Sequence, residues 1–388
     1  MHNSQPKPIL TIGFLPKQYY QRAALALRTL FSNTDIPFNL LIVDSNMSPR
    51  YRSEIEALVS DRTNCRFLES GTFLQPNECK NLVVEEAADD YVCILENDTI
   101  IEPRCIESLL DCVRRHDDNV IATPVLYDGD MSFNRLHHDP SLGYIQSWTE
   151  NDTEYRQILP EPEIGKRLTL TRELRIDVME THMFLFHKKV ADRMGAMDPV
   201  INTREPIDTS LSAYKASIPI MLEPRARGTF TDAQHLETDD LPFWRHAWNV
   251  ARAQYSHEYL KEKWNLVKMG ESMPFVKEKY AMLDSEILEL SRSAKLPERF
   301  FHRPIPNPGF SMTREGDDYR LQCETGENTM SCNDVAALVY SLCDGERTVC
   351  DIVLDIKSQL ESEAPDIVTD IDYVIKNLET PGALELRQ

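Results

Sequence analysis

The sequence has no apolar stretch near the roughly 20 residues that a membrane-spanning helix requires, and this excludes a transmembrane helix. It also lacks an excess of basic residues, since 42 lysines and arginines stand against 63 acidic residues and give a formal net charge of −21. Nucleic acids and anionic membranes require basic patches, so neither is an expected partner. The first residues, MHNSQPKPILTIGF, lack the basic segment and apolar run of a signal peptide, and we expect a cytoplasmic protein.

Closely paired cysteines are also missing. The nine cysteines are an odd number and are scattered along the chain, so we expect reduced core residues rather than disulfides. None of the CxxC pairs typical of a zinc site occurs among the four cysteines near the C-terminus, Cys323, Cys332, Cys343 and Cys350.

The length of 388 residues, with 41% hydrophobic and 27% charged side chains, predicts two globular domains. The segment RPIPNPG at 303–309 contains three prolines and a glycine, a change in composition that predicts a stiff linker. We therefore predict a first domain over 1–270, a helical and proline-rich linker over 271–309, and a second domain over 310–388.

The N-terminal half alternates apolar runs with helical patterns, which predicts a sheet with continuous buried strands and helices on both faces. The expected strands are 9–15, 38–43, 65–69 and 91–95, and the expected helices are 17–32, 50–60 and 77–88. Residues 128–175 are polar and irregular, so we expect an insertion or a mobile loop there.

Polar residues follow three of these strands: Pro16, then Asp44-Ser45-Asn46, then Glu96-Asn97-Asp98. Ligands of such sheets bind beyond the carboxyl ends of the strands. Two carboxylates separated by one residue can hold a divalent cation that also grips phosphates. Ordinary loop carboxylates give the same pattern, so the residues alone leave both interpretations open.

The order of these segments resembles family 2 glycosyltransferases of the GT-A fold, on the residues Val43–Asn46, Cys79-Lys80-Asn81 and Glu96-Asn97-Asp98. The resemblance implies an α/β domain with a mixed, mostly parallel sheet, a UDP-hexose donor and a divalent metal, Mn²⁺ or Mg²⁺. It assigns the metal to Asp98 and Glu96, with His235 as a candidate third ligand; Glu96 replaces the usual first aspartate. The implied nucleotide-sugar contacts are Pro16, Asp44, Asn46, Lys80, Asn81, Glu96 and Asn97.

A downstream segment, Arg204–Asp208, resembles the acidic motif that begins a helix in the same family. The resemblance implies an inverting transfer in which a carboxylate removes the proton of the acceptor. Glu205 is the preferred base and Asp208 the alternative. Both side chains would also complement the N-terminus of a helix that starts at Pro206, a purely structural role. The processive QxxRW motif is absent, which disfavours a polymer synthase.

The segment Cys332–Thr348, CNDVAALVYSLCDGERT, resembles PqqD, a small winged-helix-like α+β domain also called a RiPP recognition element. Turn signals predict a β-hairpin over 310–330, followed by helices near 333–342, 348–362 and 367–379. The resemblance implies that a leader peptide adds a strand to the small sheet and lies against the last helix. The implied contacts, which would equally suit a packed core, are Tyr319, Leu321, Ile371, Val374, Ile375 and Leu378.

Together these features predict a glycosyltransferase that modifies a side chain of a ribosomally made precursor peptide. From Phe310 onward 17 acidic side chains stand against 6 basic ones, so we expect an apolar or basic leader. One alternative is an acceptor that is a small molecule or glycan, with the C-terminal domain as a scaffold. Another is a non-catalytic nucleotide-binding member of a peptide-maturation complex.

Overall fold

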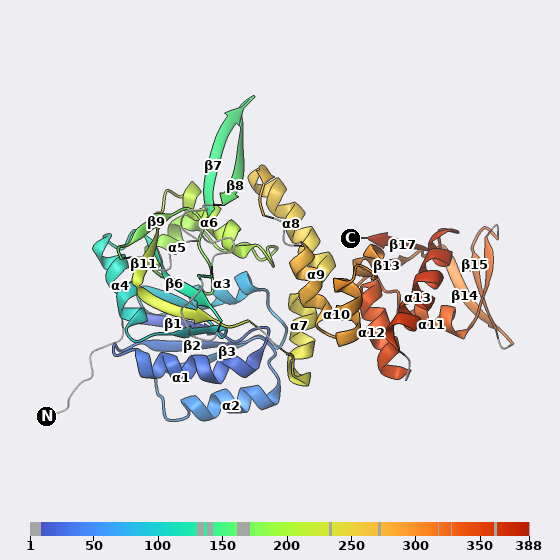
Figure 1. The fold of residues 1–388 in the computed structure, drawn as a ribbon, viewed down its shortest axis with the longest axis horizontal. Helices are drawn as coiled ribbons and strands as arrows, with labels where there is room; N and C mark the ends of the chain where they lie inside the picture. The colour runs from blue at the N-terminus through green and yellow to red at the C-terminus, as the bar shows by residue number, and fades with distance from the viewer. Residues whose placement is uncertain are drawn as a thin grey trace. The chain divides into compact units, whose positions relative to one another are not determined.

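The computed structural model describes residues 9–129, 136–137, 143–160, 171–232, 235–270, 273–316, 318–326, 328–360 and 363–387. The chain divides into two units (Figure 1). The first comprises 1–247 and 256–271, and the second comprises 248–255 and 272–388. Within the described ranges, no helix combines the length and the apolar character needed to cross a bilayer. None of the nine cysteines, all of which lie in the described ranges, forms a disulfide.

A nine-stranded mixed sheet organises the first unit, in the order β3-β2-β1-β4-β10-β6-β11-β5, with β9 paired to β11. The first four strands pair in parallel, as the apolar runs predict, whereas β10 lies antiparallel between β4 and β6. Parallel and antiparallel pairings are equally frequent overall, so the sheet is mixed rather than mostly parallel. The strands are β1 (Leu10–Leu15), β2 (Asn39–Asp44), β3 (Cys65–Glu69), β4 (Tyr91–Glu96), β5 (Thr99–Ile101), β6 (Ile121–Asp128), β9 (Leu174–Ile176), β10 (Met183–His187) and β11 (Ile220–Phe230).

Helices cover both faces of this sheet. Successive side chains of β2 enter different apolar clusters: Leu40 and Ile42 pack in one, and Leu41 and Val43 pack in the other. Such two-sided burial explains the continuous apolar runs of the strands. The helices are α1 (Ala23–Asn33), α2 (Pro49–Val59), α3 (Pro76–Glu86), α4 (Cys105–Arg115), α5 (Lys188–Met194), α6 (Glu205–Lys215), α7 (Leu241–Ala247) and α8 (Val250–Trp264), with 3-10 turns η1 (Tyr20–Arg22) and η3 (Thr238–Asp240).

A second sheet lies where the sequence suggested a loop. Strands β7 (Gly143–Glu150) and β8 (Thr153–Pro160) form an antiparallel hairpin, and β12 (Leu266–Lys268) pairs with β8. The hairpin turn, Asn151-Asp152, has positive φ at both residues, which Asn and Asp tolerate well. Figure 1 shows the hairpin projecting from the rest of the first unit. The expectation of a mobile loop over 128–175 is therefore wrong for these strands.

The second unit begins before the predicted domain boundary. Its elements are α9 (Met273–Ala281), α10 (Ser285–Arg292), η4 (Glu298–Phe301), β13 (Arg303–Pro306), β14 (Phe310–Glu315), β15 (Asp318–Cys323), β16 (Thr329–Cys332), α11 (Asp334–Leu342), α12 (Val349–Gln359), α13 (Ala364–Glu379) and β17 (Leu384–Arg387). Strands β14, β15 and β16 form an antiparallel sheet, and β13 pairs with β17. The expected hairpin is thus extended by a third strand.

Residues 273–306 are part of this unit's core and are not a linker. Val276, Tyr280, Phe300 and Phe301 are buried in one apolar cluster with side chains of all three C-terminal helices. The buried Tyr280 hydroxyl also donates to Asp351, a residue of the capping box that begins α12. Prolines such as Pro304 and Pro306 fit here because β13 pairs only with β17, on one of its edges.

Gly13 of β1 allows α3 to approach the first sheet. A Cβ at this position would lie 2.3 Å from Cγ1 of Val83 on α3. We predict that Gly13→Ala lowers the free energy of unfolding by about 1–3 kcal/mol, because the core must shift to relieve the overlap. Urea denaturation measures the effect.

Gly270→Ala is the matched control, since a Cβ there meets no atom within 4 Å. The double variant Gly13→Ala/Val83→Ala removes the overlapping methyl groups. Its loss in free energy of unfolding should therefore be smaller than the sum of the losses in the two single variants. Equal effects of Gly13→Ala and Gly270→Ala would contradict this account.

Candidate active site

A buried carboxylate lies at the carboxyl end of β4. Glu96 is 1% exposed, and its backbone N–H donates to the carbonyl oxygen of His182 at 2.9 Å. In the parallel register of β1 and β4, Leu15 lies beside Glu96. Lys17, two residues after Leu15, therefore emerges next to this carboxylate.

Three cationic groups surround the Glu96 carboxylate. Lys17 Nζ lies 2.7 Å from Oε2, and His182 Nδ1 lies 2.9 Å from the same oxygen. Lys80 Nζ, from α3, lies 3.4 Å from Oε1. Burial opposes ionisation of Glu96, but the two lysines and His182 hold its pKa below the ordinary value. The pKa of Lys17 shifts in the opposite direction. Burial opposes the charge of Lys17, but the carboxylates of Glu96, Glu205 and Asp98 hold its pKa above the ordinary value.

Asn97 shapes the backbone beside this cluster. Its side-chain oxygen accepts from the N–H of Lys17, and its side-chain nitrogen donates to the carbonyl oxygen of Tyr19, both at 2.9 Å. Asn97 and the buried Pro16 thereby fix the segment that presents Lys17. Both were predicted as nucleotide-sugar contacts, and in the structure the Asn97 amide is engaged by the protein's own backbone.

Asp98 approaches the same ring nitrogen of His182 as Glu96 does. Its Oδ1 is 3.2 Å from His182 Nδ1, and its backbone oxygen accepts from the N–H of Thr231 at 2.9 Å. Burial opposes a charge on His182, but Asp98 and Glu96 together raise its pKa well above the ordinary value. Ligand atoms of Glu96, Asp98 and His182 all lie within 4.8 Å of one another.

This grouping can hold a divalent cation. Both Glu96 oxygens and His182 Nδ1 are buried atoms without a well-aligned hydrogen bond to the described residues, so they can turn toward a metal. Carboxylate oxygens are the ligands that Mg²⁺ and Mn²⁺ prefer, and imidazole is a common additional ligand. His137 and Glu180 form a second metal-capable group with His182. The donor set therefore fits the implied metal.

His235, the predicted third ligand, is not part of either group. Its side chain is exposed, and its backbone oxygen accepts a hydrogen bond from the side chain of Gln21. Among the described residues, His182 is the histidine that lies with Glu96 and Asp98. The sequence signal for His182 is weak: it lies directly before the apolar strand β10, in the segment Glu180-Thr181-His182, which resembles an acidic cluster of the family but assigns no role to the histidine.

The two candidate bases point to different surroundings. Glu205 begins α6 and is 8% exposed, with Oε1 3.9 Å from Lys17 Nζ and 4.0 Å from Lys80 Nζ. Asp208 is 1% exposed and its Oδ1 accepts from Lys263 Nζ and Trp264 Nε1, each at 2.7 Å. Glu205 thus adjoins the ion cluster, whereas Asp208 is engaged by the end of α8.

Other predicted nucleotide-sugar contacts have partners within the protein. Asp44 pairs with Arg52 at 2.5 Å and accepts from the N–H of Met47 at 2.9 Å. Asn46, next to it, is exposed and has a positive φ of 56°. These contacts shape the turn after β2, which leaves the Asn46 side chain accessible.

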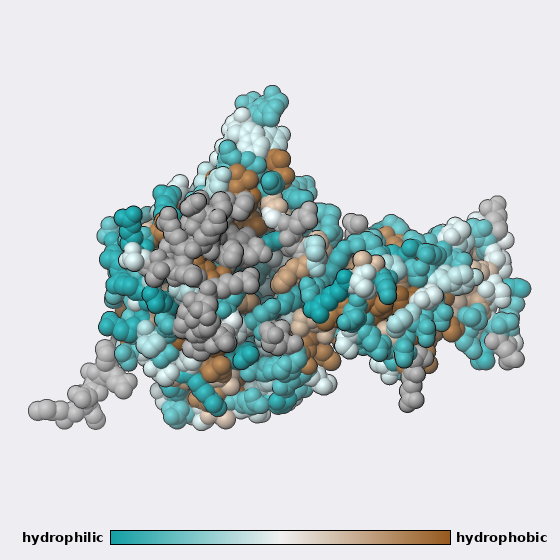
Figure 2. Space-filling model, viewed as in Figure 1, coloured by the Kyte–Doolittle hydropathy of each residue, from teal (hydrophilic) through white to brown (hydrophobic). Residues whose placement is uncertain are grey.

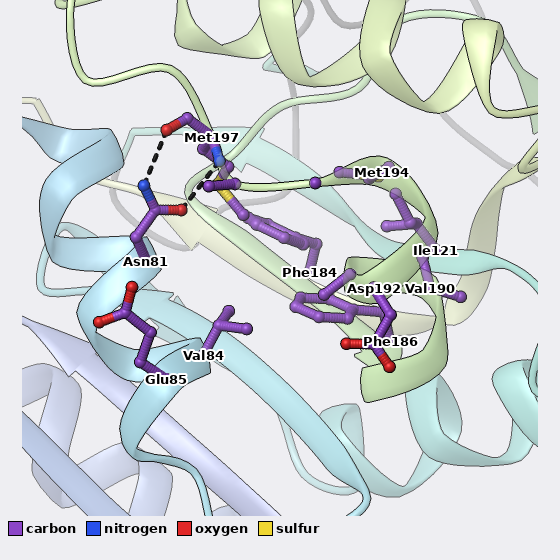
Figure 3. Close-up of a pocket in the computed structure, with 13 residues that line it drawn as sticks. Asn81, Val84, Glu85, Ile121, Phe184, Phe186, Val190, Asp192, Met194 and Met197 are labelled. Atoms are coloured by element: carbon purple, nitrogen blue, oxygen red, sulfur yellow. Dashed lines mark hydrogen bonds between the residues drawn. The ribbon is translucent and has the colours of Figure 1, made fainter.

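Asn81 faces away from the ion cluster. Its amide exchanges two hydrogen bonds with the backbone of Met197, at 2.7 and 2.9 Å (Figure 3). It lies at one side of a pocket of about 240 Å³ lined mainly by apolar side chains of α3, β10 and α5, including Phe184 and Val190. The residues that line this pocket do not include Glu96, Asp98 or Glu205, so Asn81 fixes the segment before α6 rather than joining the ion cluster.

The residues predicted to contact a peptide are mostly core residues of the second unit. Leu321, Ile371, Val374, Ile375 and Leu378 are 0–8% exposed, and only Tyr319 is partly accessible. Moreover, β15 already pairs with β14 and β16 on its two edges, so it cannot accept a further strand. The prediction of direct peptide contacts is therefore wrong for these five buried side chains.

Residues 19–195 match the sequence model of glycosyl transferase family 2, so this part of the chain is a glycosyltransferase domain. The crystal structure of GalNAc-T7 with UDP, GalNAc and Mn²⁺ aligns with a TM-score of 0.46 and 11% identity, over 86% of this chain and 68% of that one. The mannosyltransferase PcManGT from Pyrobaculum calidifontis, in complex with GDP-Man and Mn²⁺, aligns with a TM-score of 0.41 and 13% identity, over 75% and 74%. No curated protein matches the chain.

We predict that His182→Gln and Asp98→Asn each weaken Mn²⁺ binding by at least about tenfold, because each removes a ligand of the buried group. His235→Gln is the matched control and should bind like the unaltered protein. Calorimetric titration of the full chain, after removal of metals by a chelator, measures the affinities. Weaker binding by His235→Gln, with His182→Gln unaffected, would refute the assignment.

Proposed function

We propose that the protein transfers a sugar, with inversion, from a nucleotide-sugar donor to a side chain of a ribosomally made precursor peptide held by its second unit. The observation that carries the transfer is the grouping of Glu96, Asp98 and His182 beside Lys17, Lys80 and Glu205 at one edge of the sheet. A UDP-hexose is the proposed donor, from the family resemblance.

In this proposal Asp98 and His182, with Glu96, hold a divalent metal. When bound, it neutralises negative charge on the departing diphosphate. Lys17 and Lys80 add fixed positive charge around Glu96, so a phosphate that approaches the edge meets ammonium groups already in position. The exposed Asn46 is available to the nucleoside at the neighbouring strand end.

Glu205 is the proposed base. It accepts the proton of the acceptor hydroxyl or thiol as that atom attacks the anomeric carbon, and the nucleoside diphosphate leaves from the opposite face. Its position supports this role, because Oε1 lies near both lysines and the side chain retains some exposure. Asp208 is bound by Lys263 and Trp264, and the proposed role for it is structural.

We predict that Glu205→Gln lowers kcat for transfer by about 10²–10⁴-fold, because the amide cannot accept the acceptor's proton. Binding of Mn²⁺ and donor should change little. Steady-state kinetics with calorimetric donor binding separates these quantities.

Asp208→Asn is the comparison variant, and it should reduce thermal stability more than it reduces kcat. If Asp208→Asn instead removed turnover in a stable protein while Glu205→Gln remained active, Asp208 would be the base.

The peptide half of the proposal rests on the second unit. A three-stranded antiparallel sheet followed by three helices supports the PqqD-like assignment. Among these three strands, β14 and β16 are the sheet edges. We favour β16, because α11 follows it directly and carries Val335 and Leu338, which are 42% and 37% exposed.

The spacing of these two residues suits a side-chain contact with an added strand. Val335 and Leu338 are three residues apart on α11 and therefore share one face of the helix. On the face of the second unit that Figure 2 shows, hydrophilic residues predominate and apolar residues lie between them. The backbone edge of β16 would supply hydrogen bonds and the two side chains would supply selectivity.

We predict that Val335→Asp/Leu338→Asp lowers the rate of peptide glycosylation by at least about tenfold at limiting peptide, because tethering no longer raises the local acceptor concentration. Hydrolysis of the donor without peptide should be unchanged. Intact-mass analysis of a precursor peptide and assay of free nucleotide measure the two activities.

Leu360→Asp is the matched control, since Leu360 is 47% exposed in the same unit at the end of α12. Point variants are preferable to deletion from residue 310, because 273–306 share the core with the later helices. Full peptide modification by the double variant would contradict the proposed surface. Equally fast transfer to a small sugar acceptor, with no transfer to peptide, would favour a small molecule or glycan as substrate.

A further inference from the structure

The end of α4 carries a further group of side chains that can hold a metal, none of which belongs to the candidate active site: Cys112 in the last turn and His116, the residue that follows the helix. Cys112 and His116 are four residues apart, so they lie on the same helix face. Glu173, directly before β9, contacts both of them. Cys112 Sγ lies 3.5 Å from Oε2 of Glu173, and His116 Nε2 lies 3.3 Å from Oε1.

Each separation is close to the edge length of a zinc coordination tetrahedron, although the sulfur and the nitrogen contact different oxygens of Glu173. Zinc bonds of about 2.3 Å to sulfur and about 2.0–2.2 Å to nitrogen and oxygen place neighbouring ligand atoms about 3.3–3.6 Å apart. Ligand atoms of Cys112, His116 and Glu173 all lie within 4.8 Å of one another. A cation can therefore enter with small side-chain rotations and no change of the backbone.

The exposure of the three residues provides an entry route. Cys112 is 0% exposed, while the side chains of His116 and Glu173 are each 32% exposed. A metal can approach from the imidazole and carboxylate side and reach the sulfur behind them. A soft thiolate together with an imidazole favours zinc over Mg²⁺ or Mn²⁺.

The surrounding charges are compatible with a bound cation. Arg115 lies 3.0 Å from Glu173 but 2.6 Å from the Glu223 carboxylate, whose side chain is 2% exposed. Arg225 also pairs with Glu223, at 3.0 Å. Arg115 contacts Oε2 of Glu173, the oxygen beside Cys112, and can remain on Glu223 when Oε1, the oxygen beside His116, turns toward a metal.

We propose that Cys112, His116 and Glu173 form a zinc site, with water as the fourth ligand. The Cys112 thiol loses its proton to solvent as the zinc–sulfur bond forms, and Glu173 binds as the carboxylate. Thiolate and carboxylate together balance the charge of the ion. The site joins the end of α4 to the residue that precedes β9, and so secures β9 against β11.

Cobalt(II) is the probe for this site, added to the full chain after removal of metals. A thiolate-to-cobalt charge-transfer absorption reports coordination by cysteine, and the group of Glu96, Asp98 and His182 contains no sulfur that could produce it. The expected result is one such cobalt per chain, displaced by added zinc. Cys112→Ser should abolish the absorption, and His116→Gln should weaken cobalt affinity by at least about tenfold.

Cys65→Ser is the control, because Cys65 is a partly buried cysteine on β3. The proposal fails if the charge-transfer absorption is absent, persists in Cys112→Ser or is lost equally in Cys65→Ser. Should Cys112→Ser not fold, His116→Gln and Glu173→Gln decide, since both alter partly exposed side chains. Full cobalt affinity in these two variants would overturn the assignment. Donor hydrolysis is measured separately, so failure of the zinc site leaves the transferase proposal intact.

Discussion

The buried negative charge of Glu96 constrains much of the first unit. A carboxylate taken out of water costs several kcal/mol unless cations compensate it. Here the compensation comes from three different parts of the fold: Lys17 after β1, Lys80 on α3 and His182 before β10. Displacing any of these elements would leave a charge without its partner, so the pairing of strands and the docking of α3 are coupled to the site.

Helix α3 connects this charge cluster to the segment that leads to Glu205. It can lie close to the sheet because Gly13 leaves room for Val83, and this approach brings Lys80 to Glu96. The same helix holds the segment before α6 through hydrogen bonds from Asn81 to the backbone of Met197. One well-packed helix thus positions both a cation of the cluster and the segment that leads to Glu205.

The strand ends were predictable from the sequence because parallel buried strands have continuous apolar runs, and Glu96 and Asp98 follow such a run directly. The position of His182 beside Glu96 could not be predicted in this way, because it depends on an antiparallel strand, β10, that pairs with β4. The register pairs Met183 with Leu95, which puts His182 opposite Glu96. Periodicity along the chain carries no information about which strands become neighbours, and the family resemblance pointed to His235 instead.

A similar limit applies to the last helix, where Ile371, Val374, Ile375 and Leu378 form an apolar stripe at helical spacing. Such a stripe fits either a core or an open groove, and only the neighbouring elements decide between them. In this unit α13 packs against α10, α11, α12 and β17. Helix α10 comes from the segment that the prolines had suggested was a linker, so the sequence alone could not show that this segment covers part of the stripe. Because this stripe is covered, the proposed peptide would contact the free backbone edge of β16 and the exposed apolar side chains of α11.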